Sequence, residues 1–454
     1  MRAVSDRESA SGAASEGPYS AAYTNYVLLV VLGVMIFNNV DRTILSILIG
    51  PIKQEFSLSD TEMGFLLGPA FTIVYSALAL PVARWADFGV RRSILAGGLF
   101  LWSLFTMGTY WVQSFWQLFA MRMGVGVGEA AGTAPTLSML SDYVPPERRG
   151  RGLSVVSIGA VTGMGLGMVV GGYLNELYGW RTAFLAAGLP GIVLALVIRL
   201  TVKEPPRGGS DARGRSTEGE SFGGSIRYLL SLRTFRIILL ANAFSLFAAM
   251  GRNLWEPEFI VRIYDMGTAS AGLWYFLTSP VPSMLGIYLG GRFGDRLGSR
   301  DTRWYLLVPA IGQLISVPIL LAFLLWPESD HIVLPGFIAA LGLESIPVAF
   351  VLSTIGSVFG SFFTANFLAT IQGISKLRMR ALAAAISGTV SSFVGLCAGP
   401  LLVGVVSDAF QVRFGEESLR YSLLVPTAAP LISAAICIFG AKGVGRDLER
   451  ARVG

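Results

Sequence analysis

The stretch SIPVAFVLSTIGSVFGSFFTANFLATIQG (residues 345–373) contains no charged side chain from end to end. A helix that crosses the hydrocarbon core of a bilayer needs about 20 consecutive, mostly apolar residues. This stretch is long enough, and the runs at residues 266–291 and 381–407 are also free of charge. The sequence therefore predicts membrane-spanning helices, because a helix satisfies all of its backbone hydrogen bonds within one segment.

Working outward from this stretch, we expect twelve membrane-spanning helices in an all-α protein. Between the sixth and the seventh lies KEPPRGGSDARGRSTEGESFGGSIR (203–227), whose charge and Pro, Gly and Ser content are typical of a linker. The expected parts are a disordered cytoplasmic tail (1–22), a six-helix bundle (23–202), a cytoplasmic linker (203–232), a second six-helix bundle (233–441) and a cytoplasmic tail (442–454). The expected spans are residues 24–48, 61–83, 92–112, 115–141, 152–174, 181–202, 236–260, 269–291, 303–326, 345–373, 380–407 and 420–441.

The composition excludes most classes of soluble protein. The chain is 53% hydrophobic and 14% charged, with a mean hydropathy of +0.61, whereas soluble domains carry about 25% charged residues. Cys397 and Cys437 lie in apolar runs and His331 lies in a polar loop, so neither a disulfide scaffold nor a metal site is indicated. No Walker A motif or nucleophile elbow occurs, and we expect no cofactor and no enzymatic activity.

The basic residues indicate how the chain is oriented. Of the 35 Lys and Arg residues, 27 fall on the side that holds both termini, five on the other side and three within spans. Because basic loops stay in the cytoplasm, we expect a multi-pass protein of the inner (plasma) membrane with both termini cytoplasmic. The pI of about 9.4 follows from this topology and requires no nucleic-acid partner.

Two loops repeat one pattern. ARWADFGVRRSIL (83–95) joins the second and third spans, and GRFGDRLGSRDTR (291–303) joins the eighth and ninth. Asp87 and Asp295 occupy the same place in each loop, with a small residue four positions earlier and arginines after them. Two six-helix halves related by duplication are the architecture of many secondary transporters.

Twelve spans, a basic central loop and this paired motif resemble the major facilitator superfamily, whose loop motif is roughly G-x-x-x-D-R-x-G-R-R. The first loop departs from it at Ala83 and Phe88 but keeps Asp87, Arg91 and Arg92. The second loop matches it at Gly291, Asp295, Arg296, Gly298 and Arg300. The resemblance implies the major facilitator fold, with two six-helix bundles around a central cavity.

A narrower resemblance is to the Spinster branch of that superfamily, the sphingolipid and lysophospholipid transporters. NNVDRTIL (38–45) is similar to the Asp-Arg pair of its first helix. RMGVGVGEAAGTAPTLSMLSD (122–142) is similar to its fourth helix, and KEPPRG (203–208) is similar to the end of its first half. Many bacterial organic-anion transporters have related fourth helices, so the superfamily is the firmer of the two resemblances.

Four ionisable residues fall inside spans of the first half, where each costs about 2.5–3.5 kcal/mol on insertion scales. They are Asp41, Arg42, Arg122 and Glu129. Asp41 and Arg122 lie at similar depth, whereas adjacent Asp41 and Arg42 point about 100° apart. We therefore expect Asp41 to pair with Arg122 and Arg42 to be free for an anionic headgroup. The alternative is a static salt-bridge network that holds two helices together.

Glu129 is the best candidate for reversible protonation and Asp41 is the second. Glu129 follows Arg122 by seven residues, which is nearly two turns or about 10 Å along the axis. It therefore shares a face with Arg122 but lies deeper, in an apolar setting that favours the neutral carboxyl. All four charged residues are expected to contribute to substrate binding as well.

The second half offers three weaker candidates for substrate binding. Arg252 lies three residues from the position that the repeat makes equivalent to Asp41, with Trp255 and Glu256 within a turn. The alternative is that Arg252 lies near the interface and extends its side chain to water. Thr364 and Asn366 on the tenth span either line the cavity or bond neighbouring helices.

Residues of the two loop motifs are candidates for a gate. A carboxylate at a helix terminus and nearby arginines can close one end of the cavity by ion pairs and helix-dipole contacts. The alternative, a topology signal, explains the arginines but not the two aspartates. The expected gating residues are Asp87, Arg91, Asp295, Arg296 and Arg300.

The fifth span is rich in glycine. Gly159, Gly163 and Gly167 recur every four residues and therefore lie along one face. Small residues at this spacing let two helices approach closely in lipid, so we expect a tight neighbour at this face.

The function we expect is proton-coupled transport of an amphipathic anion by alternating access, with a lysophospholipid or a sphingosine phosphate-like lipid as substrate. The lipid comes from the Spinster resemblance; the anion is suggested by Arg42 and Arg122. An alternative is a small organic anion such as a sugar phosphate or a carboxylate, and another is a membrane enzyme or lipid receptor. The expected partners are the substrate and protons, and each chain carries a complete pathway, so we expect a monomer.

Overall fold

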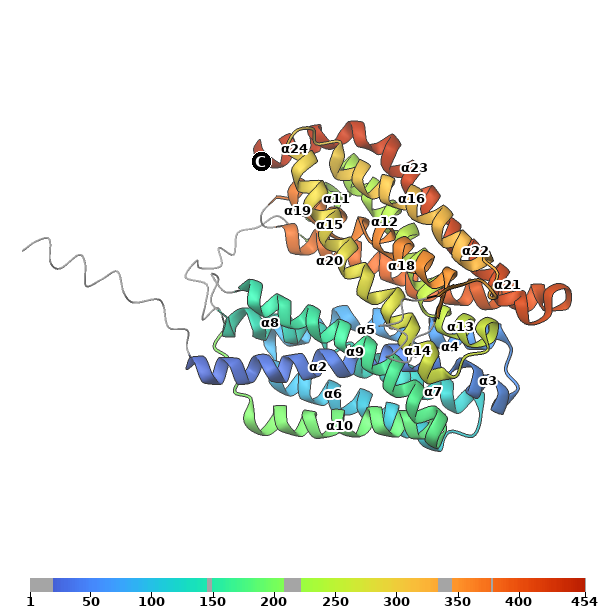
Figure 1. Cartoon of the computed structure of the whole chain (residues 1–454). Coiled ribbons are helices and arrows are strands. Elements are labelled where there is room, and N and C mark those ends of the chain that lie inside the picture. The colour runs from blue at the N-terminus through green and yellow to red at the C-terminus, as the bar shows by residue number, and fades with distance from the viewer. Residues whose placement is uncertain (1–18, 145–148, 208–221, 334–344, 377–378, 454) are drawn as a thin grey trace, which may run out of the picture.

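The computed structural model describes residues 19–144, 149–207, 222–333, 345–376 and 379–453. These residues form two helical bundles of similar size, which we call the N-half and the C-half (Figure 1). Among the described residues, nine helical stretches are long and apolar enough, by length and composition, to cross a membrane.

The N-half begins with α2 (Ala21–Ile47) and a short helix, α3 (Ile49–Phe56). The next span consists of two helices in line, α4 (Asp60–Leu67) and α5 (Pro69–Phe88). α6 (Arg91–Gly108) follows with a 3-10 turn (Thr109–Trp111), and then come α7 (Phe115–Glu129) and α8 (Thr133–Tyr143). The half ends with α9 (Arg149–Tyr178) and α10 (Trp180–Thr201).

The C-half has the same order of elements. It contains α12 (Arg233–Asn253), α13 (Glu256–Tyr264), α14 (Thr268–Thr278), α15 (Pro280–Gly298), α16 (Trp304–Leu325), α18 (Val348–Gly360) and α19 (Phe363–Ile374). Its last two spans are α20 (Arg380–Ser392), a π-helical turn (Phe393–Ala398) and α21 (Gly399–Phe414), then α22 (Ser418–Ala428) and α23 (Pro430–Gly440). Two short antiparallel strands, β1 (His331–Val333) and β2 (Ser345–Pro347), stand between α16 and α18.

Each of the twelve expected spans falls on one of these helices or on helices joined end to end. The expected division near residues 113–114 is confirmed, because Ser114 caps α7 by accepting a hydrogen bond from the Gln117 amide. The expected linker carries an additional helix, α11 (Phe222–Ser231), and the expected C-terminal tail carries α24 (Val444–Val453). Of the expected N-terminal tail, residues 1–18 lie outside the described part of the chain.

The glycine face of α9 packs tightly on a neighbouring helix, as the sequence predicts, and that helix is α2. A methyl group at Gly163 would lie 2.3 Å from the Ile36 carbonyl oxygen, and one at Gly159 would lie 2.6 Å from the side chain of Met35. Both distances are too short for a side chain. These glycines therefore bring α9 against the helix that carries Asp41 and Arg42.

The two halves meet at the end opposite the termini and separate toward the end that carries them (Figure 1). Where they meet, α4 faces α21 and α9 faces α14. A methyl group at Gly404 would lie 2.2 Å from the Asp60 carbonyl oxygen, and one at Gly172 would lie 2.3 Å from that of Thr268. Because neither seam has room for a side chain, we call this the closed end of the molecule.

Candidate functional site

The four charged residues predicted in the N-half gather between α2 and α7. Arg42 Nε donates to Glu129 Oε2 at 2.7 Å, which makes a charge-assisted ion pair. The guanidinium carbon of Arg42 lies 5.3 Å from the ring centroids of both Phe71 and Tyr75 on α5. These distances are within the range of cation–π attraction. Arg42 is therefore held by a carboxylate and by two aromatic faces.

The predicted pairing within this cluster is wrong. Arg122 Nη1 donates to the backbone oxygen of Asp41, at 3.2 Å, and not to its carboxylate. Arg42, which we expected to be free, pairs with Glu129. Arg122 does lie at the level of Asp41, as their equal depth predicts. The long Arg42 side chain, however, reaches the carboxylate of Glu129, which lies nearly two turns beyond Arg122 on α7.

The cluster is almost closed to solvent except at one residue. Asp41, Arg122 and Glu129 are 2%, 4% and 0% exposed, whereas the side chain of Arg42 is 31% exposed. Three of its polar atoms have no hydrogen-bond partner among the described residues: Asp41 Oδ1, Arg122 Nε and Glu129 Oε1. A charged atom left in this state is costly, so the cluster has capacity to take a proton or a ligand group.

The C-half contains a cavity of about 470 Å³, within the size range of small-molecule sites. Apolar side chains make up much of its wall, and polar groups stand among them. Thr364, one of the predicted residues, lines this cavity. Its polar lining residues include Asn242, Ser245, Arg252, Gln313, Ser357, Thr364, Ser387 and Thr427.

Arg252 lies in the last turn of α12 and lines the same cavity. Its Nη1 lies 3.5 Å from Glu256 Oε2 at the start of α13, a longer and looser ion pair than Arg42–Glu129. Glu256 also accepts a hydrogen bond from Ser353 Oγ at 2.9 Å. Arg252 is only 8% exposed, so it does not extend to open water as the alternative interpretation supposed.

Asn366 is placed differently from the prediction that it lines the cavity. Its Nδ2 donates to the backbone oxygens of Gly290 and Phe362, both at 2.8 Å, and it is not among the cavity residues. A methyl group at Gly294 would lie 1.7 Å from Asn366 Oδ1, so the amide is pressed against α15. Asn366 therefore holds α19 on α15, which is the other interpretation of this residue.

The predicted gating residues lie at the end where the halves are apart. Asp87, Asp295, Arg296 and Arg300 are exposed in this conformation. Arg91 is buried, and its partners belong to the N-half and to the start of the linker that follows it. It donates to Asp142 at 2.5 Å, Glu204 at 2.8 Å, Ser138 at 2.9 Å and the Pro205 backbone oxygen at 2.8 Å.

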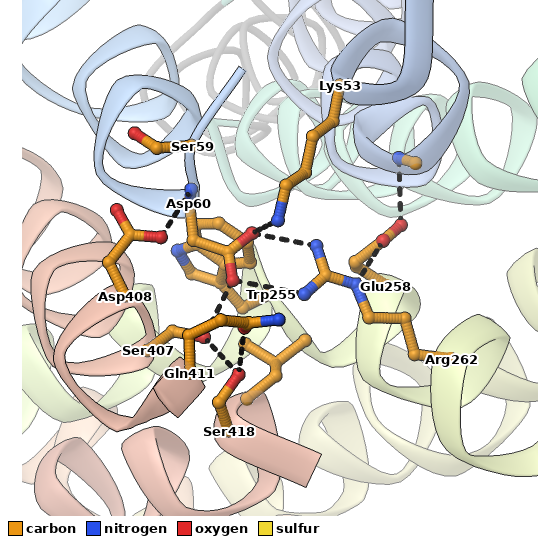
Figure 2. A network of polar contacts seen from close by, with 12 residues as sticks. Lys53, Ser59, Asp60, Trp255, Glu258, Arg262, Ser407, Asp408, Gln411 and Ser418 are labelled. Atoms are coloured by element: carbon orange, nitrogen blue, oxygen red, sulfur yellow. Dashed lines mark hydrogen bonds and ion pairs between the residues drawn. The ribbon is translucent and has the colours of Figure 1, made fainter. Parts of the chain in front are cut away.

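The closed end carries an ionic network that the sequence analysis missed. Figure 2 shows Asp60, at the start of α4, between Lys53 of the N-half and Arg262 of the C-half. Arg262 donates two hydrogen bonds to its carboxylate, at 2.8 and 3.1 Å, and Lys53 Nζ lies 2.5 Å from it. Ser407 Oγ of α21 donates a further hydrogen bond to the Asp60 carboxylate, at 2.6 Å. Asp60 is 0% exposed, so this is a buried ion pair across the two halves.

Carboxylates of each half also accept hydrogen bonds from backbone amides of the other half. Asp408 of α21 accepts from the amides of Asp60 and Thr61 at 2.9 and 2.8 Å, and thereby caps α4. At the second seam, Glu176 of α9 accepts from the Ala269 amide in the first turn of α14 at 2.9 Å. In the order of helices, α4 of the N-half corresponds to α14 of the C-half, and α9 corresponds to α21. The two caps are therefore equivalent contacts made in opposite directions between the halves.

One sequence signal pointed to this network without identifying it. Ser59 and Glu62 form a capping box, which fixes the start of α4 at Asp60. Lys53 and Arg262 were counted only as charges of the loops. In the described part of the chain, no group of three or more His, Cys, Asp or Glu residues is arranged to hold a metal ion.

Two bundles joined at one end, with buried charge inside, define a membrane transporter of two repeated halves. A family model described as Major Facilitator Superfamily matches residues 31–343. The chain belongs to this superfamily of secondary transporters, and it is similar to members of its Spinster branch. The family prediction from the loop motifs and from NNVDRTIL is confirmed.

The individual relatives agree with this assignment. An "MFS-type efflux pump" of Mycolicibacterium smegmatis is 31% identical over 417 residues, covering 91% of this chain and 92% of that protein. "Protein spinster homolog 1" of Homo sapiens is 25% identical over 450 residues, covering 94% and 82%. A solved bacterial homologue of the human lysosomal transporter Spinster, in an inward-facing and unoccupied conformation, has a TM-score of 0.83 at 26% identity, covering 94% of this chain and 99% of that one.

The fold and the family together establish the mode of action at a coarse level. A secondary transporter works by alternating access, in which the two halves open in turn to the two sides of the membrane. The present conformation, closed at one end and separated at the other, is one of these states.

Proposed function

We propose that this protein is a proton-coupled transporter of an amphipathic anionic lipid, either a lysophospholipid or a sphingosine phosphate-like lipid. One observation carries the proposal: the partly exposed Arg42 is ion-paired to the fully buried Glu129 inside the membrane-spanning bundle. Ionisable residues at such depth are rare and functional by default. The Spinster relatives support the lipid, since the Spinster branch resembled by the sequence comprises lysolipid and sphingolipid transporters.

The Arg42–Glu129 pair offers a way to link a proton to an anion. The planar guanidinium of Arg42 matches a phosphate with two hydrogen bonds, but Glu129 already occupies its Nε. Protonation of Glu129 removes the carboxylate charge and frees Arg42 for the anionic headgroup. Asp41, whose Oδ1 has no partner among the described residues, is the second proton acceptor.

Reorientation requires the closed end to open. The Asp60–Arg262 pair and the two reciprocal caps must break together, because they join the same two halves. We propose that Asp87, Arg91, Asp295, Arg296 and Arg300 then close the opposite end. A ligand can drive this step only by binding the two states with different affinity.

A small organic anion, such as a sugar phosphate or a carboxylate, is the second candidate substrate. The polar groups in the 470 Å³ cavity of the C-half favour it, because an acyl chain alone makes no hydrogen bonds. The arginines would hold the anion in this case as well.

We further propose that the protein lies in the inner (plasma) membrane as a monomer, with both termini in the cytoplasm. The distribution of Lys and Arg supports the orientation. A single chain holds both halves and both seams, so one copy supplies a full pathway.

The experiment is flux of a labelled lysophospholipid into proteoliposomes, with and without an imposed pH gradient. Flux that the gradient stimulates is expected. Flux that does not depend on the gradient would refute proton coupling but would still support the lipid as substrate. No flux in either condition would remove the lipid and shift the assignment to small organic anions, which the same liposomes test.

A further inference from the structure

Four unpartnered polar atoms from four helices converge on the cavity of the C-half. They belong to Arg252 of α12, Gln313 of α16, Ser357 of α18 and Thr427 of α22, all of which line the cavity. The atoms Arg252 Nη1, Gln313 Oε1, Ser357 Oγ and Thr427 Oγ1 have no hydrogen-bond partner among the described residues. Each residue is at least nine-tenths buried, with 8%, 1%, 2% and 3% exposed. A buried group in this state marks a place for a ligand or for water.

The amide of Gln313 shows what the ligand must offer. Gln313 Nε2 donates to Ser245 Oγ at 2.6 Å, and Ser245 passes its own proton to the Ala241 backbone oxygen at 2.8 Å. Ser433 Oγ lies 3.0 Å from the same hydroxyl. With its nitrogen bonded to Ser245, Gln313 keeps an oxygen without a partner among the described residues, and the residue lines the cavity. This oxygen is an acceptor only, so it requires an O–H or N–H from the ligand.

Arg252 shows what charge the ligand carries. Its Nη1 lies 3.5 Å from Glu256 Oε2 without a hydrogen bond between them, so the donor remains available. The side chains of Ser357 and Thr427 donate or accept by rotating their hydroxyls. The cavity thus offers a cation with hydroxyl groups around it. This arrangement fits a ligand that carries an anionic oxygen group and has hydroxyl groups next to it.

The lining favours an extended head over a compact anion. Ser245, the partner of Gln313, and Arg252 are seven residues apart on α12, about 10 Å along the axis. The Arg252 side chain covers part of this span, and the hydroxyls of Ser357 and Thr427 offer further bonding positions in the same cavity. An extended head that carries a phosphate at one end and hydroxyls along its length reaches both Arg252 and Gln313.

We propose that the cavity of the C-half is the headgroup site for a phosphate ester that bears free hydroxyl groups, a polyol phosphate. The proposal rests on the proposed transport function and specifies the substrate's head. The phosphate lies at Arg252, and a hydroxyl of the ligand donates to Gln313 Oε1. Ser357 and Thr427 bond the remaining ligand oxygens. A head that leaves these groups without hydrogen bonds binds weakly, because each buried polar group left unpaired costs free energy.

Two serines of the cavity provide a matched test. Ser357 Oγ is unpartnered, whereas Ser316 Oγ donates to the Gly356 backbone oxygen at 2.7 Å; both are buried and both line the cavity. We expect Ser357→Ala and Gln313→Leu each to weaken binding about 5- to 10-fold, the loss of one hydrogen bond. Ser316→Ala is expected to bind as the wild type does.

The measurement is equilibrium binding to the purified full-length protein in nanodiscs, by titration calorimetry, with thermal unfolding to show that each variant is folded. The probes are lysophosphatidylglycerol and lysophosphatidylcholine with the same acyl chain, and free glycerol 3-phosphate. Lysophosphatidylglycerol is expected to bind more tightly than lysophosphatidylcholine, because its head carries hydroxyls. Gln313→Leu should remove that preference.

The outcomes separate this site from the proposed function. Binding of lysophosphatidylglycerol that falls in Ser357→Ala and Gln313→Leu supports the site with a lipid ligand. Binding of glycerol 3-phosphate alone, with the same dependence, supports the site and overturns the lipid substrate. Binding that both variants leave unchanged, or equal losses in Ser316→Ala, overturns the site even when gradient-driven flux is intact. Failure of all three probes to bind the wild type overturns it too.

Discussion

The N-half concentrates charge where the C-half concentrates neutral hydrogen-bonding groups. In the N-half, two arginines and two carboxylates crowd between α2 and α7, and Arg42 alone among the four is substantially exposed. In the C-half, Gln313, Ser357 and Thr427 line a cavity together with Arg252, which forms only a loose ion pair with Glu256 at 3.5 Å. The two halves have similar helical architecture but hold different chemistry.

This difference suggests a division of labour. A buried carboxylate changes its charge when a proton binds, and that change alters every ion pair around it. A neutral amide or hydroxyl has no such switch, but it rejects a ligand that leaves it unpaired. We therefore expect substitutions in the N-half to change coupling to the proton gradient, and substitutions in the C-half to change which ligand binds.

The largest effect is expected for Glu129→Gln. The amide is close to the carboxyl in size but cannot be ionised, so Arg42 loses its switchable partner. Gradient-driven flux in proteoliposomes should fall by about 100-fold or more, since proton-transfer groups contribute about 10²–10⁴. Exchange of labelled for unlabelled substrate without a gradient should continue.

Glu55→Gln is the matched control for that variant. Glu55 is a half-exposed carboxylate that pairs with Arg181 at 2.6 Å outside the cluster. It should transport normally. Normal gradient-driven flux in Glu129→Gln would refute the assignment of Glu129, and loss of exchange together with coupling would show damage to the whole pathway.

The second effect concerns the place where the two halves are joined. Arg262→Gln leaves the buried carboxylate of Glu258 without its ion-pair partner, and it leaves Asp60 paired only with Lys53 of its own half. Removing one partner of a buried pair costs about 3–5 kcal/mol, and here the cost falls on the conformation with this end closed. The population should therefore shift toward the state in which it is open.

Spin labels at the exposed positions Gln54 and Val412, in a background without the two native cysteines, measure this shift as a longer distance between the halves. Arg413→Gln is the control, because Arg413 is exposed at the same end. An unchanged distance distribution in Arg262→Gln would mean that the glycine seams alone hold this end closed.

The fold was predictable because a chain that crosses a membrane can satisfy its backbone hydrogen bonds in few ways. A chain with uncharged runs of the length at 345–373 must form helices there, and the glycine spacing on α9 indicated a tight helix neighbour, which the structure identifies as α2. The breaks within spans were harder to foresee, although the pairs at Gly68–Pro69 and Ser279–Pro280 mark two of them.

The sites were predictable in part. Charge inside a span is a strong signal, and it found all four residues of the N-half cluster; side-chain reach then decided the pairing, which helical periodicity does not give. Asp60 and Arg262 lie at the ends of spans, where charge is ordinary. Gln313 and Ser357 are neutral, and such residues commonly bond a neighbouring helix, as Asn366 does.

A pair of conservative substitutions sharpens the comparison between the halves. Arg42→Lys keeps the charge but loses the planar contact with Phe71 and Tyr75 and the forked hydrogen bonds. We expect about tenfold slower gradient-driven flux and an altered dependence on pH. Arg252→Lys should weaken ligand binding about threefold and leave the pH dependence unchanged. Equal effects of both variants on the pH profile would contradict the division of labour.

The smallest effect is expected for Glu55→Gln. This variant tests whether a charged pair outside the membrane-spanning segments contributes to proton coupling. A hydrogen bond from Arg181 lowers the pKa of Glu55, which lies outside the spanning segments. A lowered carboxyl pKa adds stability above the unfolded value near 4.3, and this stability is lost as the pH falls through the lower pKa of the folded state. Because the pair is exposed, Glu55→Gln should cost at most about 1 kcal/mol of unfolding free energy at pH 7 and less at pH 3. Thermal unfolding of the two proteins at both pH values measures this difference. A larger cost, or a change in flux, would place a coupling charge outside the N-half cluster.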